Sequence, residues 1–228
     1  DDIYVFNFKD GIGDPLDVDG HGTHCAGIIG AARNNDIGIS GVAPVRLMAL
    51  KFLSYDSGQM SDALEGFNYA VQMGVKISSN SYGGSKRLEG FGEAIAAQPD
   101  HIFIAAAGNM GMDNDQVPQF PCNYAVENVV CVGATSQSQS RASFSNYGVQ
   151  GVDIGAPGVG IWSTYGVSYS QLDGSSMAGP YVAGLAALVS VFSPLLDASQ
   201  VIQIIYDSGT ESASYSDFRT SKQIDAAE

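Results

Sequence analysis

Short apolar runs alternate with amphipathic segments along most of the chain, and this alternation restricts the fold more than any other feature. Runs with strand character alternating with helices are typical of a parallel sheet covered by helices on both faces. We therefore expect an α/β domain in three layers, with a mostly parallel central sheet. The expected strands are 45–52, 75–80, 102–107 and 129–132, and the expected helices are 61–73, 89–97, 176–191 and 199–206.

The 228 residues suffice for one substantial core, and nothing in them forces a second domain. We therefore expect residues 1–228 to form one domain. Ten basic residues against 24 acidic ones give a formal net charge of −14. Such a surface repels phosphate backbones, which argues against a nucleic-acid partner. The longest apolar stretch, 182–192, is too short to span a bilayer, so we expect no membrane span.

Three cysteines leave at least one without a partner in the chain. Cys122 and Cys131 flank a short polar segment and could form a disulfide, which would favour an oxidising compartment. Two buried thiols are the alternative. Cys25 has no obvious partner, and we expect it to be buried as a small apolar residue rather than to act as a nucleophile.

His21 stands in the segment DGHGTHCAGIIG, whose small residues would permit close helix packing. A helix beginning near His21 would hold the imidazole rigidly at its N-terminal end. His24 follows three positions later on the same helix face, so a metal-binding pair is an alternative. A zinc protease would need H-E-x-x-H, and Gly22 stands where that motif has its glutamate, which argues against zinc.

Ser176 stands in DGSSMAGPYVAG, where a long buried helix is expected to start and its dipole would favour developing negative charge. Pro180 fits the first turn of that helix, where a missing N–H does no harm. Taken alone, Ser175 or Ser176 would be interpreted as a helix cap. Asn109 ends the apolar run AAAGN and offers a carboxamide donor suited to an oxyanion, although an ordinary turn asparagine would look the same.

Together, these three segments resemble the subtilisin-like serine protease family, with some features of its proteinase K branch. HGTHCAG, AAAGN and GSSMAGP match the family's three signatures in order. The segments SYGG at Ser81, RASFSNYG at Arg141 and APG at Ala156 match as well, and the resemblance covers essentially the whole chain. It implies the three-layer subtilisin-like fold.

The resemblance also implies a serine endopeptidase that forms an acyl-enzyme on Ser176, with His21 as general base. Asn109 and the backbone N–H of Ser176 would form the oxyanion hole. A polypeptide substrate would lie as an added β-strand between two extended edges. The residues implied for substrate binding lie on these edges and on the walls of the primary specificity pocket: Asp56, Ser57, Gly58, Ser81, Tyr82, Gly83, Ala107, Gly108 and Met110, with 119–121 as a further wall.

The segment RNNDIGI, which starts at Arg33, resembles the family's high-affinity calcium loop. Calcium takes six to eight oxygen ligands, which one loop can supply from carbonyl groups and side chains. The resemblance implies the Asn35 side chain and the carbonyl groups of Arg33, Ile37 and Ile39 as ligands. We therefore expect a structural Ca²⁺, with the family's remaining ligands upstream of residue 1.

The family's triad aspartate ends the first buried strand and precedes Ser or Thr and then Gly. Here the apolar run 3–6 leads into Asn7 instead; Asp10 is a poor match, and Asp19 lies too close along the chain to His21. We expect the aspartate and the first strand of the sheet upstream of residue 1, together with an inhibitory prodomain. Without that carboxylate the imidazole would not be oriented, and this polypeptide by itself would be nearly inert.

Two other functions compete with an active, monomeric, secreted or vesicular endopeptidase. A pseudoprotease would bind peptides in the same cleft without cutting them, and it would require another residue at the aspartate position. An α/β-hydrolase esterase needs G-x-S-x-G and the order Ser, acid, His. Ala178 stands where the last Gly belongs and His21 comes first, so we exclude the esterase.

Overall fold

The computed structural model describes residues 5–55 and 57–226, and its main feature is a six-stranded sheet. The first five strands in the spatial order run parallel, and only the last, β9, is antiparallel to its neighbour. In spatial order the strands are β3 (Ile77–Asn80), β4 (Ile102–Ala106), β5 (Val129–Thr135), β6 (Ile154–Pro157), β10 (Lys222–Gln223) and β9 (Thr210–Glu211).

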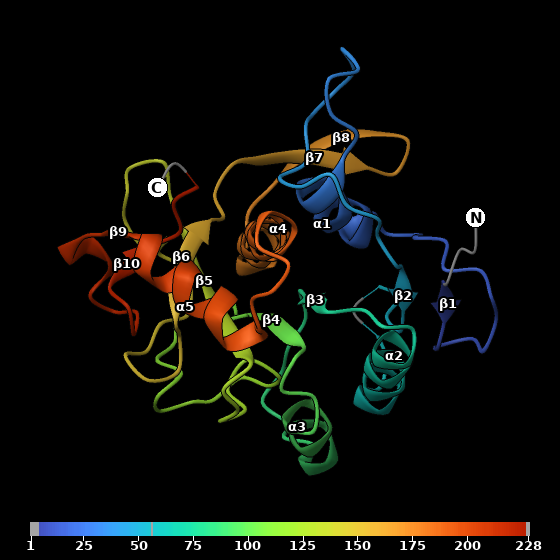
Figure 1. Ribbon diagram of the computed structural model, residues 1–228, viewed down its shortest axis with the longest axis horizontal. Helices are drawn as coiled ribbons and strands as arrows, with labels where there is room; N and C mark the ends of the chain where they lie inside the picture. The colour runs from blue at the N-terminus through green and yellow to red at the C-terminus, as the bar shows by residue number, and fades with distance from the viewer. Residues whose placement is uncertain (1–4, 56, 227–228) are drawn as a thin grey trace.

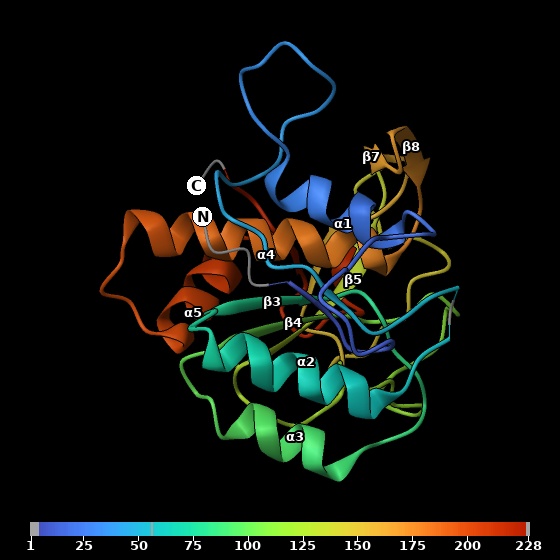
Figure 2. The ribbon, with the colours of Figure 1, turned by 90° about the vertical axis from the view of Figure 1, so that its right-hand side faces the viewer.

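Helices cover both faces of this sheet, as the layers in Figures 1 and 2 show. Side chains of the central strands alternate between the two faces. In β4, Ile102 and Ile104 pack in the core under α4 and α5, whereas Phe103 and Ala105 pack in the core under α2 and α3. The helices are α1 (His21–Gly30), α2 (Met60–Gln72), α3 (Glu89–Ala96), α4 (Ser175–Phe192) and α5 (Ala198–Ser208). The predicted α/β class with a mostly parallel sheet is therefore confirmed.

The helix α1 lies outside α4 and is covered in turn by a β-hairpin, as Figure 1 shows. The hairpin consists of β7 (Ile161–Tyr165) and β8 (Ser168–Leu172). Near the C-terminus, a short 3-10 helix spans Ala213–Tyr215. Helix α1 thus lies between the hairpin and α4.

The predicted strand 45–52 is wrong in most of its length. Only Leu50–Lys51 (β2) is a strand, and it pairs in parallel with Phe6–Asn7 (β1) in a separate two-stranded sheet. Much of the preceding segment is exposed, with Leu47 at 44% of its surface. A strand inside a parallel sheet would be buried on both faces, which this segment is not.

Helix α4 begins one residue earlier than predicted, at Ser175, with Gly174 as its N-cap. Pro180 is therefore the sixth residue of the helix and lies in its second turn, so the prediction that it occupies the first turn is wrong. By length and composition α4 could cross a membrane, but most of it is buried in the protein. Its packing against α1 and the sheet accounts for that apolar composition.

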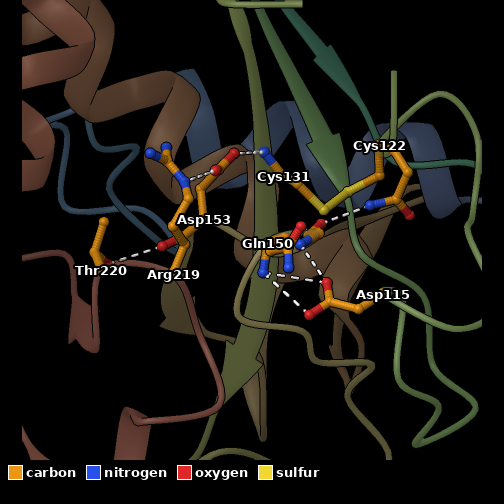
Figure 3. Close-up of polar contacts among 9 residues, drawn as sticks. Asp115, Cys122, Cys131, Gln150, Asp153, Arg219 and Thr220 are labelled. Carbon is orange, nitrogen blue, oxygen red and sulfur yellow. Dashed lines mark hydrogen bonds and ion pairs between the residues drawn. A yellow bond between two sulfur atoms is a disulfide. The ribbon is translucent and has the colours of Figure 1, made fainter. Parts of the chain in front are cut away.

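The cysteines resolve the alternatives left open by the sequence. Cys122 and Cys131 form a disulfide, which Figure 3 shows between the segment before β5 and β5 itself. Cys25 is free and buried, as predicted. Burial raises the pKa of its thiol to about 11, so the thiol is protonated at neutral pH.

Candidate active site

His21 is the first residue of α1, and the turn before it is held by Asp17. One carboxylate oxygen of Asp17 accepts from the N–H of Gly20 at 2.9 Å, and the other accepts from both the N–H and the hydroxyl of Thr23 at 2.7 Å. Burial alone would raise the pKa of Asp17, but these hydrogen bonds outweigh it and hold the pKa below its ordinary value. This role was not predicted from the sequence, because Asp17 stands three residues before the N-cap Gly20 and so does not occupy the standard capping position.

The backbone carbonyl of Ser176 accepts hydrogen bonds from outside its own helix. Residue 180 would normally donate to it, but Pro180 has no N–H. The Ser81 hydroxyl donates to this carbonyl oxygen at 2.8 Å, and the Cys25 thiol donates at 3.4 Å. In return, the Ser176 hydroxyl lies 3.5 Å from the carbonyl oxygen of Ser81.

The contact between the Cys25 thiol and the Ser176 carbonyl brings His21, the predicted base, close to Ser176, the predicted nucleophile. His21 and Cys25 are four residues apart on α1 and so share one helix face. Because Cys25 touches the carbonyl oxygen of Ser176, the second turn of α1 lies against the first turn of α4. His21 is thus one helical turn from a direct contact with Ser176.

Asn109 follows β4 and contacts the start of α4. Its Oδ1 accepts from the backbone N–H of Ser175 at 2.8 Å and from the Ser175 hydroxyl at 2.9 Å. Among the described residues, no acceptor is hydrogen-bonded to the Nδ2 group of Asn109, so this group can donate to a ligand. A Cβ built on Gly174 would lie 3.3 Å from that Nδ2 and 3.5 Å from the backbone nitrogen of Ser176. The two predicted oxyanion donors therefore lie beside the same residue, Gly174.

The loop that carries Asn109 is held by a buried pair of asparagines that the sequence analysis did not assign. Asn146 Oδ1 accepts from the N–H groups of Met110 and Met112 at 2.9 and 3.1 Å. Its Nδ2 donates to Asn114, whose own Nδ2 donates to the carbonyl of Ala107. Asn146 lies in the RASFSNYG segment, so the motif was visible although its role was not.

The loop that carries Asn109 requires a glycine at position 108. The φ of 109° at Gly108 favours glycine, and a Cβ there would lie 2.5 Å from Asn146 Nδ2. The loop therefore packs directly on Asn146. Of the predicted pocket residues beside it, Ala107 is fully buried, while Met110 is 60% exposed and free to contact a ligand.

The two predicted substrate edges lie together. The rings of Phe52 and Tyr82 meet edge to face at 4.5 Å, joining the segment before 57–58 to the 81–83 segment. Ser57 pairs with Ser54 through two backbone hydrogen bonds of 3.0 Å, and Gly58 packs on Phe52. The remaining predicted edge residue, Asp56, lies outside the described residues.

The 81–83 edge is also supported from its other side. Gly84 and Phe120 exchange two backbone hydrogen bonds, of 2.9 and 2.7 Å. Gly83 lies against the same segment, since a Cβ on it would be 3.3 Å from the carbonyl oxygen of Phe120. The predicted wall 119–121 therefore adjoins the edge that starts at Ser81.

Among the described residues, no carboxylate is hydrogen-bonded to the ring of His21. Asp19 accepts from the backbone N–H of His21 at 2.6 Å. Asp10 accepts from the side chain of Asn7 in a local turn. Neither aspartate therefore takes the place of the orienting carboxylate that the resemblance implies.

His24 is not available as the second ligand of a metal-binding histidine pair. His24 is fully buried, and its Nε2 lies 3.1 Å from the carbonyl oxygen of Ile161 and 3.2 Å from that of Ser170. Carbonyl oxygens only accept, so this nitrogen carries the proton. Burial lowers the pKa of His24, which keeps the ring neutral while it attaches the hairpin to α1.

The predicted calcium loop projects from the end of α1, as Figures 1 and 2 show. Left-handed φ values recur at every second residue, at Asn34, Asp36 and Gly38. Asn35 Oδ1 lies in the loop and accepts from the N–H of Ile37 at 3.1 Å. Within the described ranges, the three predicted carbonyl ligands, of Arg33, Ile37 and Ile39, accept no backbone hydrogen bond from the protein. These hard oxygen donors fit calcium.

A separate cavity of about 590 Å³ lies between α5 and the segment around Cys122. None of the predicted catalytic residues lines it. A peptide bound as an added strand lies along an exposed edge and needs no such hollow, so this separation is consistent with the site described above.

The sequence is similar to those of known proteins over most of its length. The model of the subtilase family matches residues 2–222. Thermitase from Thermoactinomyces vulgaris is 40% identical over 190 residues, which are 81% of this chain and 66% of thermitase. Subtilisin BL from Lederbergia lenta is 44% identical over 183 residues, which are 78% of this chain and 65% of that protein.

The fold leads to the same group. The crystal structure of a cold adapted subtilisin-like serine proteinase superposes with a TM-score of 0.84 and 32% identity. The match covers 97% of this chain and 80% of that one. The chain spans somewhat less than two thirds of the length of thermitase and subtilisin BL. With the fold and the order of its motifs in agreement, the chain belongs to the subtilase family.

Proposed function

We propose that the protein is a serine endopeptidase whose catalytic residues include His21, Asn109 and Ser176. The observation that carries the proposal is that the Asn109 Nδ2 group and the Ser176 backbone nitrogen both lie beside Gly174, within 3.3 and 3.5 Å of the position of its missing Cβ. An oxyanion placed within reach of both groups would receive hydrogen bonds from the Asn109 side chain and the Ser176 backbone. Preorganised donors of this kind stabilise the tetrahedral intermediate of acyl transfer.

The reaction then follows from the roles of three groups. His21 takes the proton of the Ser176 hydroxyl as the oxygen attacks the scissile carbonyl. The protonated imidazole gives the proton to the leaving amine, and an acyl-enzyme remains on Ser176. Water, deprotonated by His21, then hydrolyses the ester and frees the serine.

The substrate is a polypeptide that lies as an added strand along the edges at 57–58 and 81–83. Recognition through backbone hydrogen bonds makes few demands on sequence. Selectivity is assigned to the pocket between 107–110 and 119–121, where the exposed side chain of Met110 favours apolar groups. Asp56 remains a predicted member of the first edge.

The imidazole of His21 requires a carboxylate to hold its tautomer and orientation. We propose that an aspartate outside the described residues takes this role and that an inhibitory prodomain accompanies the enzyme, so the full-length protein is the form to test. An aspartate replaced in that protein would favour the second candidate, a pseudoprotease that binds peptides in the same cleft. That candidate is kept because no described carboxylate reaches the His21 ring.

The proposal extends to a bound ion and to the site of action. Ca²⁺ held by Asn35 and the carbonyl groups of Arg33, Ile37 and Ile39 would stabilise the exposed loop. The Cys122–Cys131 disulfide supports an oxidising compartment and hence a secreted or vesicular protein. We expect the enzyme to act as a monomer.

The test compares the full-length protein with its Ser176→Ala variant on an unfolded polypeptide substrate. The proposal expects the wild type to cleave internal peptide bonds and the variant to lose the activity while keeping its fold. A folded wild type that binds the polypeptide with micromolar affinity but leaves it intact would support the pseudoprotease instead.

A further inference from the structure

The segment from Gln119 to Tyr124 supports the substrate edge from behind. Phe120 exchanges its two backbone hydrogen bonds with Gly84. The Tyr124 hydroxyl donates to the carbonyl of Leu88 at 2.7 Å and accepts from the N–H of Leu88 at 3.1 Å. Any movement of this segment would therefore be passed to the edge beginning at Ser81.

The same segment is covalently joined to the central sheet by the Cys122–Cys131 disulfide, drawn in Figure 3. Cys131 lies on β5 directly opposite Ala105 of β4. The sulfur of Cys122 lies 3.5 Å from the carbonyl oxygen of Ala105. Asn109 follows only four residues after Ala105. The disulfide thus joins the wall at 119–121 to β5, which pairs directly with β4, the strand that leads to the oxyanion donor.

The sheet end of this link is rigid. The backbone N–H of Cys131 donates to Asp153 at 2.7 Å, and Asp153 forms an ion pair with Arg219 at 2.5 Å. Figure 3 shows this chain of contacts beside the disulfide. The other end has a second, non-covalent anchor in Asn123, which accepts from the N–H of Gln119 and donates to the carbonyl of Gly151, both at 2.7 Å.

From these contacts we infer that the Cys122–Cys131 disulfide is a specificity-determining element of this enzyme. It fixes the spacing between the wall at 119–121 and the wall at 107–110 of the primary pocket. The inference rests on the proposed endopeptidase function and adds to it a residue pair that touches neither the substrate nor the reacting atoms. Loss of the bond widens the range of wall positions, so large apolar side chains lose well-defined contacts while small ones have little to lose.

The test uses full-length protein with Cys122→Ala and Cys131→Ala combined. Cleavage rates are measured on two peptides that differ only in the residue before the cut, phenylalanine or alanine. We expect the ratio of kcat/KM for phenylalanine over alanine to fall by about three- to tenfold, because a pocket's hold on apolar groups is sensitive to fit. Most of the change is expected in KM. Labelling of Ser176 by methanesulfonyl fluoride, whose methyl group does not fill the pocket, should keep its wild-type rate.

Two further variants keep the test decisive. Ile205→Val lowers stability from the buried core under α4 and α5, a different cluster from the one that contains Phe120 and Cys122, and should leave the ratio unchanged. Asn123→Ala removes the second anchor while the disulfide stays intact, and it should shift the ratio in the same direction even if the double cysteine variant does not fold. An unchanged ratio in the folded cysteine variant, or an equal change in Ile205→Val, overturns the inference. A wild type that cleaves neither peptide contradicts the proposed function itself.

Discussion

The Ser81 hydroxyl donates a 2.8 Å hydrogen bond to the backbone carbonyl of Ser176, where the helix itself has no donor to offer. Pro180 removes the helical N–H that would otherwise serve this carbonyl. At this carbonyl, the Ser81 hydroxyl on the substrate edge takes the place of the missing helical donor. On this account, Ser81 is a positioning residue for the nucleophile.

A double-mutant cycle on Ser81 and Pro180 tests that role. Ser81→Ala should lower kcat about five- to tenfold with little change in KM, as expected for one lost hydrogen bond near the reacting group. Pro180→Ala restores an N–H at residue 180 that can reach the Ser176 carbonyl. In the Pro180→Ala background, Ser81→Ala should lower kcat by a clearly smaller factor. Equal costs in both backgrounds would show that Ser81 acts through something other than this carbonyl.

Replacing Asn109 separates its two functions. Asn109→Asp keeps an oxygen to accept from the N–H and hydroxyl of Ser175, but it replaces the free donor. We expect kcat to fall by about 10²–10³, the loss known for the corresponding donor in subtilisin, while the melting temperature changes little. Asn109→Ala should lose the same activity and also stability, since it removes the acceptor for the N–H and hydroxyl of Ser175. Stopped-assay kinetics and thermal unfolding of both variants provide the comparison.

His101 predicts a dependence of stability on pH. The ring is 3% exposed; its Nδ1 lies 3.0 Å from the Val75 carbonyl oxygen and its Nε2 lies 2.9 Å from the Ser78 hydroxyl. Burial, aided by the charge of Lys76, lowers its pKa to about 4 although the hydrogen bond to Val75 opposes the shift. Below its ordinary pKa of 6.5, the unfolded chain binds a proton that the folded protein excludes.

The stabilising contribution of neutral His101 is therefore complete above about pH 6.5 and is lost as the pH falls towards 4. The expected loss across that window is roughly 3 kcal/mol of unfolding free energy. Urea unfolding of the wild type and of His101→Gln at several pH values measures it. The variant should be less stable at neutral pH and show a shallower slope between pH 4 and 6.5. Parallel slopes would contradict the assignment.

Removal of calcium should destabilise the full-length protein through the loop at 33–39. With calcium at about 100 times its dissociation constant, binding contributes about 2.7 kcal/mol. For a domain of this size, chelation should then lower the melting temperature by about 5–10 °C. Asn35→Ala should shrink that difference, and Asn35→Asp, which keeps an oxygen ligand, should retain most of it. A melting temperature indifferent to chelator in the wild type would rule out the predicted ion.

The layered fold could be predicted because its buried elements carry strong local signals. The β4 strand and the α4 helix are apolar runs of the right length, and both appear within a residue of their expected limits. The segment 45–49 misled the prediction because its apolar residues are partly exposed in an extended connection. Burial depends on what packs nearby, and a single run of residues does not encode it.

Part of the candidate site could be predicted from the sequence in the same way, and part could not. Residues in the signature segments, His21, Asn109 and Ser176, could be named from the sequence as candidates. Supporting contacts such as Ser81 to Ser176 span 95 positions in the chain. No local pattern indicates such a pairing, so the support that Ser81 gives to the nucleophile became visible only in three dimensions.

The central claim is that Ser176 is a nucleophile activated by His21. The most direct measurement is mass spectrometry of full-length protein after treatment with phenylmethylsulfonyl fluoride, alongside His21→Ala. The account predicts one phenylmethylsulfonyl group on Ser176 in the wild type, with loss of peptidase activity in proportion, and labelling slowed by several orders of magnitude in His21→Ala. A folded, full-length wild type that stays unlabelled at Ser176, or that labels equally fast without His21, would contradict the account.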